Sequence, residues 1–194
     1  MSKKVATHKN IEDIRLSSSM KIKRYRELEV AKDRERIARF VVERFQERYL
    51  EPALSARTKS GFALMAINCL MIESLVSFRR GWKDTRKLSE SAFCFFFDRE
   101  GAFADFRGYA HEFYVNVRCG ILHQAETTGG WLIHLKRDKF LFNVEHKTVN
   151  AREFTERLEG CLNDYRAELE SANWEGEIWV DFRKKMKAII ENCE

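Results

Sequence analysis

The sequence of 194 residues contains very little proline and no stretch rich in glycine, serine or proline. Pro52 is its only proline, so no segment has the composition of a linker between domains. We therefore expect a single domain over residues 21–194, preceded by a loose segment over residues 1–20 that has no clear apolar period. Fifteen phenylalanines and a hydrophobic fraction of 44% supply enough apolar surface for a core of this size.

Paired cysteines and long apolar runs are also missing. The five cysteines form no CxxC pair, which indicates reduced thiols and a cytoplasmic protein. The first 16 residues are polar and charged, without the apolar centre of a signal peptide. The most apolar run, residues 62–72, is too short for a membrane span. We expect neither secretion nor membrane insertion.

Several motifs that mark a reaction class are absent from the sequence. It has no glycine-rich phosphate loop, no GxSxG elbow, and no HxxxH or HExxH spacing among its five histidines. Nucleotide-binding, serine-hydrolase and metal sites are therefore not indicated, and we expect no metal and no cofactor.

Positive charge is concentrated near the N-terminus. Residues 1–50 carry 14 Lys and Arg against 8 Asp and Glu, whereas the whole chain has a net charge of +5. Such a basic region favours a polyanionic partner such as RNA, because lysine and arginine neutralise phosphates. A solvated helix face with mixed charges is the alternative interpretation of the same segment.

Apolar residues recur at helical spacing over most of the chain. The pattern predicts helices over residues 22–49 (ending near Pro52), 58–80, 103–126, 150–170 and 174–190. Four phenylalanines within residues 93–97 either plug the bundle or meet a second subunit.

Residues 131–144 depart from the helical period. Apolar residues alternate with polar ones there, on both sides of a turn at residues 136–139, which predicts a small β-hairpin. The expected fold class is therefore mainly α, a bundle of about five or six helices with this hairpin as an appendage.

The most site-like residues lie on the helix predicted over residues 103–126. Arg118 and His123 stand five positions apart, beside a polar line that includes Asn116 and Cys119. A guanidinium that grips phosphate and an imidazole that titrates near neutral pH are suited to cleaving RNA without a metal. His123 would remove the proton of a ribose 2′-hydroxyl and Arg118 would hold the phosphate, leaving a 2′,3′-cyclic phosphate.

Two polar residues, Asn68 and Glu73, interrupt the apolar helix over residues 58–80. Each must hydrogen-bond internally, line a site or face a thinly covered side, because burying an unpaired polar group is costly. A structural interpretation of the motif follows from this. Arg118 would pair with the Glu73 carboxylate, and His123 would cap the end of its helix.

The segment RCGILH, with Arg118 and His123 at its ends, resembles the motif of the HEPN family. That motif is an arginine followed after four to six residues by a histidine, on a late helix of an all-helical bundle. The resemblance covers residues 20–170 in helix order, and Glu73 matches the acidic or polar residue often carried by an earlier helix. In ribonuclease members a polar residue usually follows the arginine, whereas this chain has Cys119 at that position. Asn116, one turn earlier, would supply the polar group instead.

The resemblance implies a metal-independent endoribonuclease of the toxin or phage-defence type. It also implies a homodimer with Arg118 and His123 at the interface, and an antitoxin or a nucleotidyltransferase as a partner. Asn116, Glu73, Cys119 and Asn68 are then the supporting residues.

A non-catalytic helical module that binds RNA or a protein is the alternative from a different functional class. It would use the basic N-terminal helix and the phenylalanines of residues 93–97. An Arg118 buried against Glu73 would favour this module, as would exposed lysines and arginines on the N-terminal helix. A solvent-open cleft holding both Arg118 and His123 would favour the enzyme.

Overall fold

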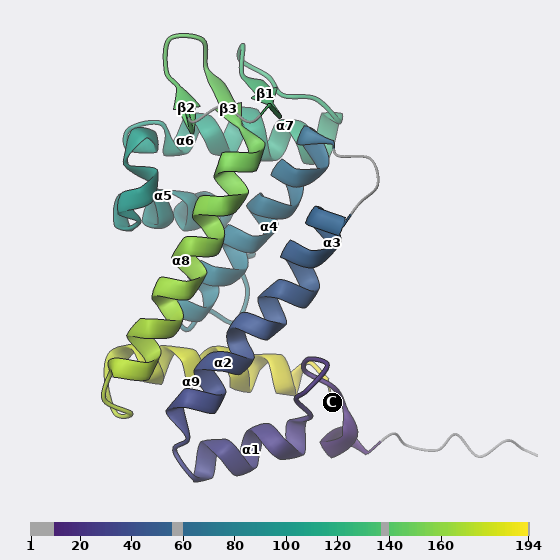
Figure 1. Ribbon diagram of the computed structural model, residues 1–194, viewed down its shortest axis with the longest axis vertical. Coiled ribbons are helices and arrows are strands. Elements are labelled where there is room, and N and C mark those ends of the chain that lie inside the picture. Colours follow the sequence, from purple (N-terminus) through teal and green to yellow (C-terminus); the bar gives the residue numbers. More distant parts are fainter. Residues whose placement is uncertain (1–9, 56–59, 137–139, 194) are drawn as a thin grey trace, which may run out of the picture.

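The computed structural model describes residues 10–55, 60–136 and 140–193, most of which are helical (Figure 1). The α-helices are α1 (Ile22–Val30), α2 (Arg34–Phe45), α3 (Glu51–Ser55), α4 (Gly61–Arg79), α5 (Ser89–Arg99), α6 (Ala110–Phe113), α7 (Gly120–Gln124), α8 (Ala151–Ser171) and α9 (Glu177–Glu191). Two further segments are 3-10 helices, η1 (Ile11–Asp13) and η3 (Gly101–Phe106), and two are π-helical turns, η2 (Gln46–Leu50) and η4 (Tyr114–Cys119). The mainly α fold is confirmed.

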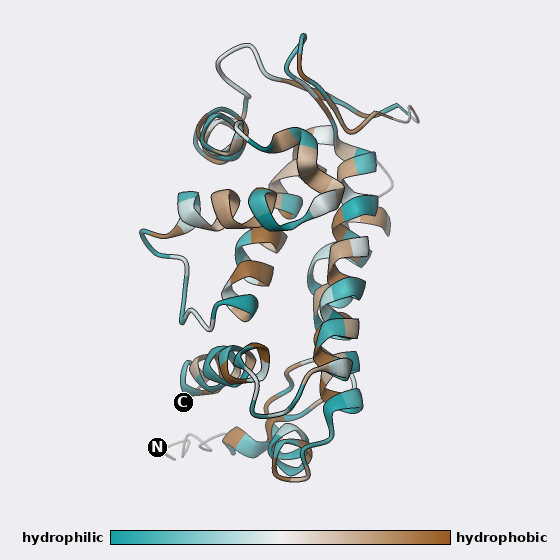
Figure 2. Ribbon diagram, turned by 90° about the vertical axis from the view of Figure 1, so that its left-hand side faces the viewer, coloured by the Kyte–Doolittle hydropathy of each residue, from teal (hydrophilic) through white to brown (hydrophobic). Residues whose placement is uncertain are grey.

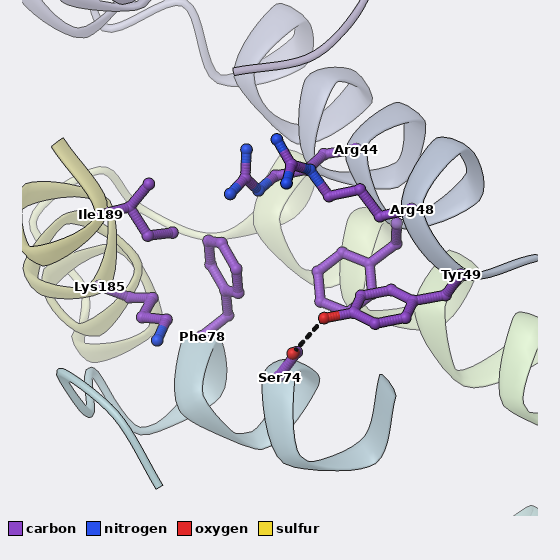
Figure 3. A pocket seen from close by; sticks show the side chains of 8 residues that line it. Arg44, Arg48, Tyr49, Ser74, Phe78, Lys185 and Ile189 are labelled. Atoms are coloured by element: carbon purple, nitrogen blue, oxygen red, sulfur yellow. Dashed lines mark hydrogen bonds between the residues drawn. The ribbon is translucent and has the colours of Figure 1, made fainter. Parts of the chain in front are cut away.

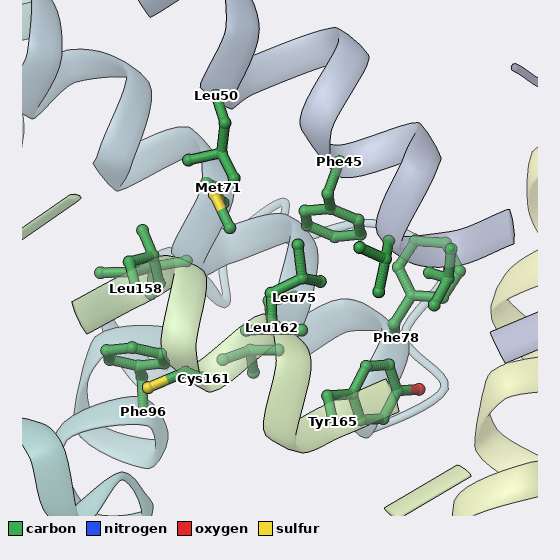
Figure 4. Packing of buried hydrophobic residues seen from close by; sticks show 14 of the residues in the cluster. Phe45, Leu50, Met71, Leu75, Phe78, Phe96, Leu158, Cys161, Leu162 and Tyr165 are labelled. Atoms are coloured by element: carbon green, nitrogen blue, oxygen red, sulfur yellow. The ribbon is translucent and has the colours of Figure 1, made fainter. Parts of the chain in front are cut away.

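Helix α4 is the centre of the bundle and packs against α5, α8 and α9, while its Phe78 ring contacts Phe45 of α2 with centroids 5.7 Å apart. The Ser60 side chain caps its start by accepting a hydrogen bond from the backbone N–H of Ala63. By length and composition alone α4 could cross a membrane, but here its apolar residues are mostly buried in the core. In Figure 4, Met71 and Leu75 of α4 lie among core residues from α2 and α8. The outer helices carry hydrophilic residues beside hydrophobic ones (Figure 2).

The phenylalanines of α5 plug the bundle. Phe93, Phe96 and Phe97 are buried, and the Phe97 ring stacks on Phe106 with centroids 4.8 Å apart. Phe95 is partly buried beneath the Arg80 guanidinium. Of the two roles expected for this group, the structure supports the core plug.

The helix expected over residues 22–49 is in fact two helices, α1 and α2. Lys32 between them has a left-handed backbone with φ of +53°, and the Asp33 side chain caps α2 by accepting from the Arg36 N–H. The predicted stop near Pro52 is also wrong, because α2 continues through η2 into α3. The wider π turn accommodates a residue that has no N–H to donate and crowds the preceding turn.

Residues 10–20 pack against the bundle, contrary to the expected loose segment. Leu16 and Met20 are buried, and the backbone N–H groups of Ser18 and Ser19 donate to carboxylates of α2 and η2. The remainder of that segment, residues 1–9, lies outside the described residues.

The β appendage is confirmed, but its pairing differs from the expected hairpin. Strands β1 (Leu132–His134), β2 (Phe142–Asn143) and β3 (Thr148–Asn150) form one sheet in the order β1-β3-β2. β3 is parallel to β1 and antiparallel to β2, so it separates the two segments that were expected to pair. Residues 137–139 of the expected turn lie outside the described residues. Trp131 stacks on Phe142 at 5.1 Å, which joins the sheet to the core.

Candidate functional site

Arg118 and His123 lie on one continuous helical segment made of α6, η4 and α7. Its middle part, Tyr114–Cys119, is π-helical, a wide turn that often occurs at functional sites. Phe113 and Val117 point into the core and are fully buried. This burial fixes the segment against α4 and α5, which are its packing neighbours.

The chain reverses directly after α7 and folds back onto the motif helix. Ala125 adopts a left-handed φ of +57°, and a Cβ on Gly120 would lie 2.6 Å from the carbonyl oxygen of Glu126. Only glycine therefore allows the returning backbone to pack this closely. The Thr128 hydroxyl and N–H donate to the side-chain and backbone oxygens of Asn116, at 2.8 and 3.0 Å. Asn116 thus anchors the returning loop.

Glu73 of α4 is the partner of Arg118. The Nε and Nη2 atoms of Arg118 lie 3.0 and 2.9 Å from Oε1 of Glu73. The other carboxylate oxygen, Oε2, accepts hydrogen bonds from the hydroxyls of Thr85 at 2.7 Å and Ser89 at 2.8 Å. Glu73 is only 6% exposed, so these donors replace the water that burial removes.

The pairing fixes both the charge and the orientation of Arg118. Burial lowers the pKa of Arg118, but the neighbouring Glu73 carboxylate raises it more, and the net pKa lies above its ordinary value. The remaining nitrogen, Nη1, lies 4.0 Å from Sγ of Cys119, and the guanidinium lies 5.6 Å from the Tyr114 ring centroid. Arg118, Glu73 and Cys119 therefore form one cluster, in which the pairing of Arg118 with Glu73 is the one expected in the structural interpretation.

His123 is exposed on the last turn of α7. Within residues 10–55, 60–136 and 140–193, no hydrogen-bond partner holds its imidazole, and the capping role expected in the structural interpretation is not formed there. The cavity beside Glu73 is lined by neither Arg118 nor His123. The two motif residues thus share a helical segment, but they do not share this cavity.

Asn68 lies apart from this cluster. It is 1% exposed, and its amide donates to the Thr155 hydroxyl at 3.0 Å, which links α4 to α8. Asn68 is therefore a core hydrogen-bonding residue. The sequence analysis did not identify Thr85 and Ser89 as partners of Glu73. The only sequence feature that points to them is their short polar side chains, just before α5 and at its first residue.

Metal chemistry finds no support in the described part of the chain. No group of three or more His, Cys, Asp or Glu residues is arranged there to hold a metal ion. Comparison with protein-family models, curated proteins and solved structures finds no match for this chain. The likeness to HEPN domains rests on the motif and the order of the helices.

Proposed function

We propose that this protein is a HEPN-like, metal-independent endoribonuclease whose site is completed by a second copy of the chain. The observation that supports the proposal most is the exposed His123, which lies on the same helical segment as an Arg118 held in one orientation. Glu73 holds two nitrogens of this arginine, and Thr85 and Ser89 hold Glu73 in turn. Phosphate transesterification requires an oriented cation and a base at one phosphate, and the proposed second copy would bring the two groups together.

In the proposed reaction, the ribose 2′-oxygen attacks phosphorus and the bond from phosphorus to the 5′-oxygen breaks. His123 accepts the 2′-hydroxyl proton, and an acid must protonate the leaving 5′-oxygen. Because each helix offers one motif histidine, a second copy supplies the acid. The products are a 2′,3′-cyclic phosphate and a 5′-hydroxyl. Arg118 neutralises the charge that develops on the phosphate.

The exposed apolar residues of the motif helix support a homodimer. Val115 and Leu122 are 41% and 39% exposed, and both lie on the helical segment that carries Arg118 and His123. Leu70, on the adjacent α4, is 44% exposed. An interface over these residues would bring two motif helices together, as the resemblance implies.

A non-catalytic module that binds RNA or a protein is the second candidate. It is favoured by two observations: the charge of Arg118 is already matched by Glu73, and most lysines and arginines of α1 and α2 are exposed. Its expected surfaces are weaker, because the phenylalanines of α5 are mostly buried and several basic residues of α1 and α2 are in ion pairs. A partner antitoxin or nucleotidyltransferase stays a proposal from the resemblance.

Cleavage of total RNA and tRNA in excess EDTA tests the enzyme proposal. Wild type, His123→Ala and Arg118→Lys are compared with His111→Ala, a control that removes an exposed histidine from the start of the same helical segment. We expect cleavage with cyclic phosphate ends by wild type and His111→Ala, and none by His123→Ala. If folded, dimeric wild type binds RNA without cutting it, the second candidate replaces the first. Equal cleavage by wild type and His123→Ala would overturn the assigned role of His123.

A further inference from the structure

Three cationic side chains from distant parts of the sequence meet at one cavity (Figure 3). Arg44 of α2, Arg48 of η2 and Lys185 of α9 line a space of about 150 Å³. The floor and walls are completed by Phe45, Tyr49, Ser74, Phe78 and Ile189. Among the residues that the structure describes, none forms an ion pair with any of the three cations.

The carboxylates nearest in sequence are engaged elsewhere. Glu43 accepts hydrogen bonds from the N–H of Ser19 and the hydroxyl of Ser18, both at 2.9 Å. Glu47 accepts the Ser18 N–H at 3.0 Å. The turn at residues 17–19 thus binds the acids of this helix and leaves its arginines without counterions.

The cations have backbone partners that do not neutralise them. Arg44 and Arg48 both donate to the carbonyl oxygen of Leu16, and Lys185 donates to the carbonyl of Lys83 at 2.9 Å. These bonds hold the side chains at the cavity while their charges persist. Burial, together with the charge of Arg48, lowers the pKa of Arg44 to about 10. Burial lowers the pKa of Lys185; the Asp84 carboxylate opposes this shift and the charge of Arg44 adds to it.

We propose that this cavity binds the phosphate group of a small phosphate monoester. Three cations around one cavity match the charge of a dianion, and the planar guanidinium of an arginine suits phosphate oxygens. The hydroxyls of Tyr49 and Ser74 hydrogen-bond each other at 2.7 Å, which leaves one of the two O–H groups to donate to a ligand at the edge of the cavity. The volume suits one tetrahedral oxyanion and is smaller than a typical pocket for a whole ligand of drug size.

An adjoining cavity defines the rest of the ligand. It has a volume of about 240 Å³ and shares Tyr49, Ser74 and Lys185 with the first cavity. Glu73 and Asp84 also line it, so a second phosphate would be repelled there. The ligand is therefore a monophosphate whose remaining part is neutral or carries hydroxyl or amino groups.

A phosphate of an RNA chain fits the observations less well. Polymer binding uses several exposed cations along a track, because affinity grows with the number of phosphates neutralised. Here only Arg48 is exposed, while Arg44 and Lys185 are partly exposed, and all three line one cavity instead of a track. RNA is therefore a competing probe and not the proposed ligand.

Isothermal titration of the full chain tests the proposal, with inorganic phosphate, adenosine 5′-monophosphate, adenosine and a single-stranded RNA as probes. The variants are Lys185→Gln and Arg48→Gln, and Lys187→Gln is the control because it removes an exposed charge from the same helix. We expect saturable binding of phosphate and of the monophosphate, and no binding of adenosine. Each cavity variant should weaken binding about tenfold, the loss of one charge-assisted hydrogen bond, and the control should not.

Comparison of the two anions identifies the source of the phosphate. Tighter binding of the monophosphate supports a ligand that also fills the adjoining cavity, and equal binding indicates free phosphate. The proposal fails if folded wild type binds neither anion, or if Lys187→Gln weakens binding as much as Lys185→Gln does. Binding of the RNA alone, with affinity that falls steeply as salt rises, would also overturn it. Circular dichroism establishes that each variant is folded.

Discussion

Arg118 and Arg44 both lie beside the central helix α4, but the charged groups around them have opposite signs. Arg118 meets the buried carboxylate of Glu73, whereas Arg44 has the cations Arg48 and Lys185 as neighbours at its cavity. The difference shows that the placement of carboxylates, more than the number of basic residues, decides which cation is open to an anion. A paired arginine is held in one orientation, and an unpaired group of cations gains stability when an anion binds.

Arg79 gives a reference for a purely structural arginine in the same fold. Its Nη1 lies 2.7 Å from the Glu168 carboxylate, its guanidinium lies 4.5 Å from the Tyr165 ring centroid, and its side chain is 4% exposed. The side chain of Arg118 is 17% exposed. Arg118 is thus more accessible than the enclosed Arg79, although both arginines are paired with a glutamate.

Removing the carboxylate from the paired region should have the largest effect. Glu73→Ala leaves the Arg118 charge partly buried without its counterion, and we expect a loss of about 3 kcal/mol in the free energy of unfolding. The double variant Glu73→Leu, Arg118→Met should recover much of this loss, because it removes both charges. Urea denaturation measures both. A loss below about 1 kcal/mol for Glu73→Ala, as for an exposed pair, would show that the ion pair does not hold the motif helix.

Disturbing the backbone around the motif should have the next largest effect. The Cβ of Gly120→Ala would clash with the returning chain at Glu126, and we expect a loss of about 2 kcal/mol. Gly160→Ala in α8 is the matched control, since nothing lies within 4 Å of the position that its Cβ would take and alanine favours a helix. The control should gain about 0.5 kcal/mol. Equal effects of the two substitutions in thermal unfolding would contradict the close approach.

The helical period was sufficient to locate α4, α8 and α9, because each of these helices buries a repeating apolar set. It did not reveal the break before α2, since Lys32 and Asp33 fit a charged helix surface as well as a turn. It also did not predict β3, which is only three residues long and lies between β1 and β2 in the sheet. Strand pairing over such short segments depends on the core contacts of Trp131 and Phe142, which a local pattern does not contain.

The two charged regions differed in how far they could be predicted. The position of Glu73 in an apolar helix indicated that its carboxylate is paired, and Arg118 was the expected partner. The cavity of Arg44 and Lys185 gave no such signal, because α2 and α9 are far apart in sequence. In addition, Glu43 and Glu47 stand beside the arginines of α2 and η2 and suggest a balanced surface. Only the packing of residues 17–19 shows that those acids are occupied.

Acid should weaken the turn that takes the carboxylates away from the arginines. Although burial opposes the shift, hydrogen bonds from Ser17, Ser18 and Ser19 lower the pKa of Glu43 to about 2. A folded-state pKa below the unfolded value means that this stabilisation is present above about pH 4.5 and is lost as the pH falls toward 2.

The variant Glu43→Gln isolates this contribution. It should lower the free energy of unfolding by about 1 kcal/mol at pH 6, the size expected for partly exposed hydrogen bonds. The difference from wild type should shrink as the pH is lowered from 5 to 2. Glu35→Gln is the control, because Glu35 forms only an exposed pair with Arg39. A difference from wild type that is constant with pH would contradict the role of the ionised Glu43.

The smallest expected effect is a gain in stability when a charge is removed from the cavity of Arg44, Arg48 and Lys185. Arg48→Gln removes one of two like charges four positions apart, and without ligand it should raise the free energy of unfolding by about 0.3 kcal/mol. Arg39→Gln removes the attractive pair with Glu35 on the exposed side of α2 and should lower it by a similar amount. Both differences should fade in high salt, where exposed charges are screened. Destabilisation by Arg48→Gln at low salt would mean that its bond to the Leu16 carbonyl outweighs the repulsion, and that the cations of this cavity are not held under electrostatic strain.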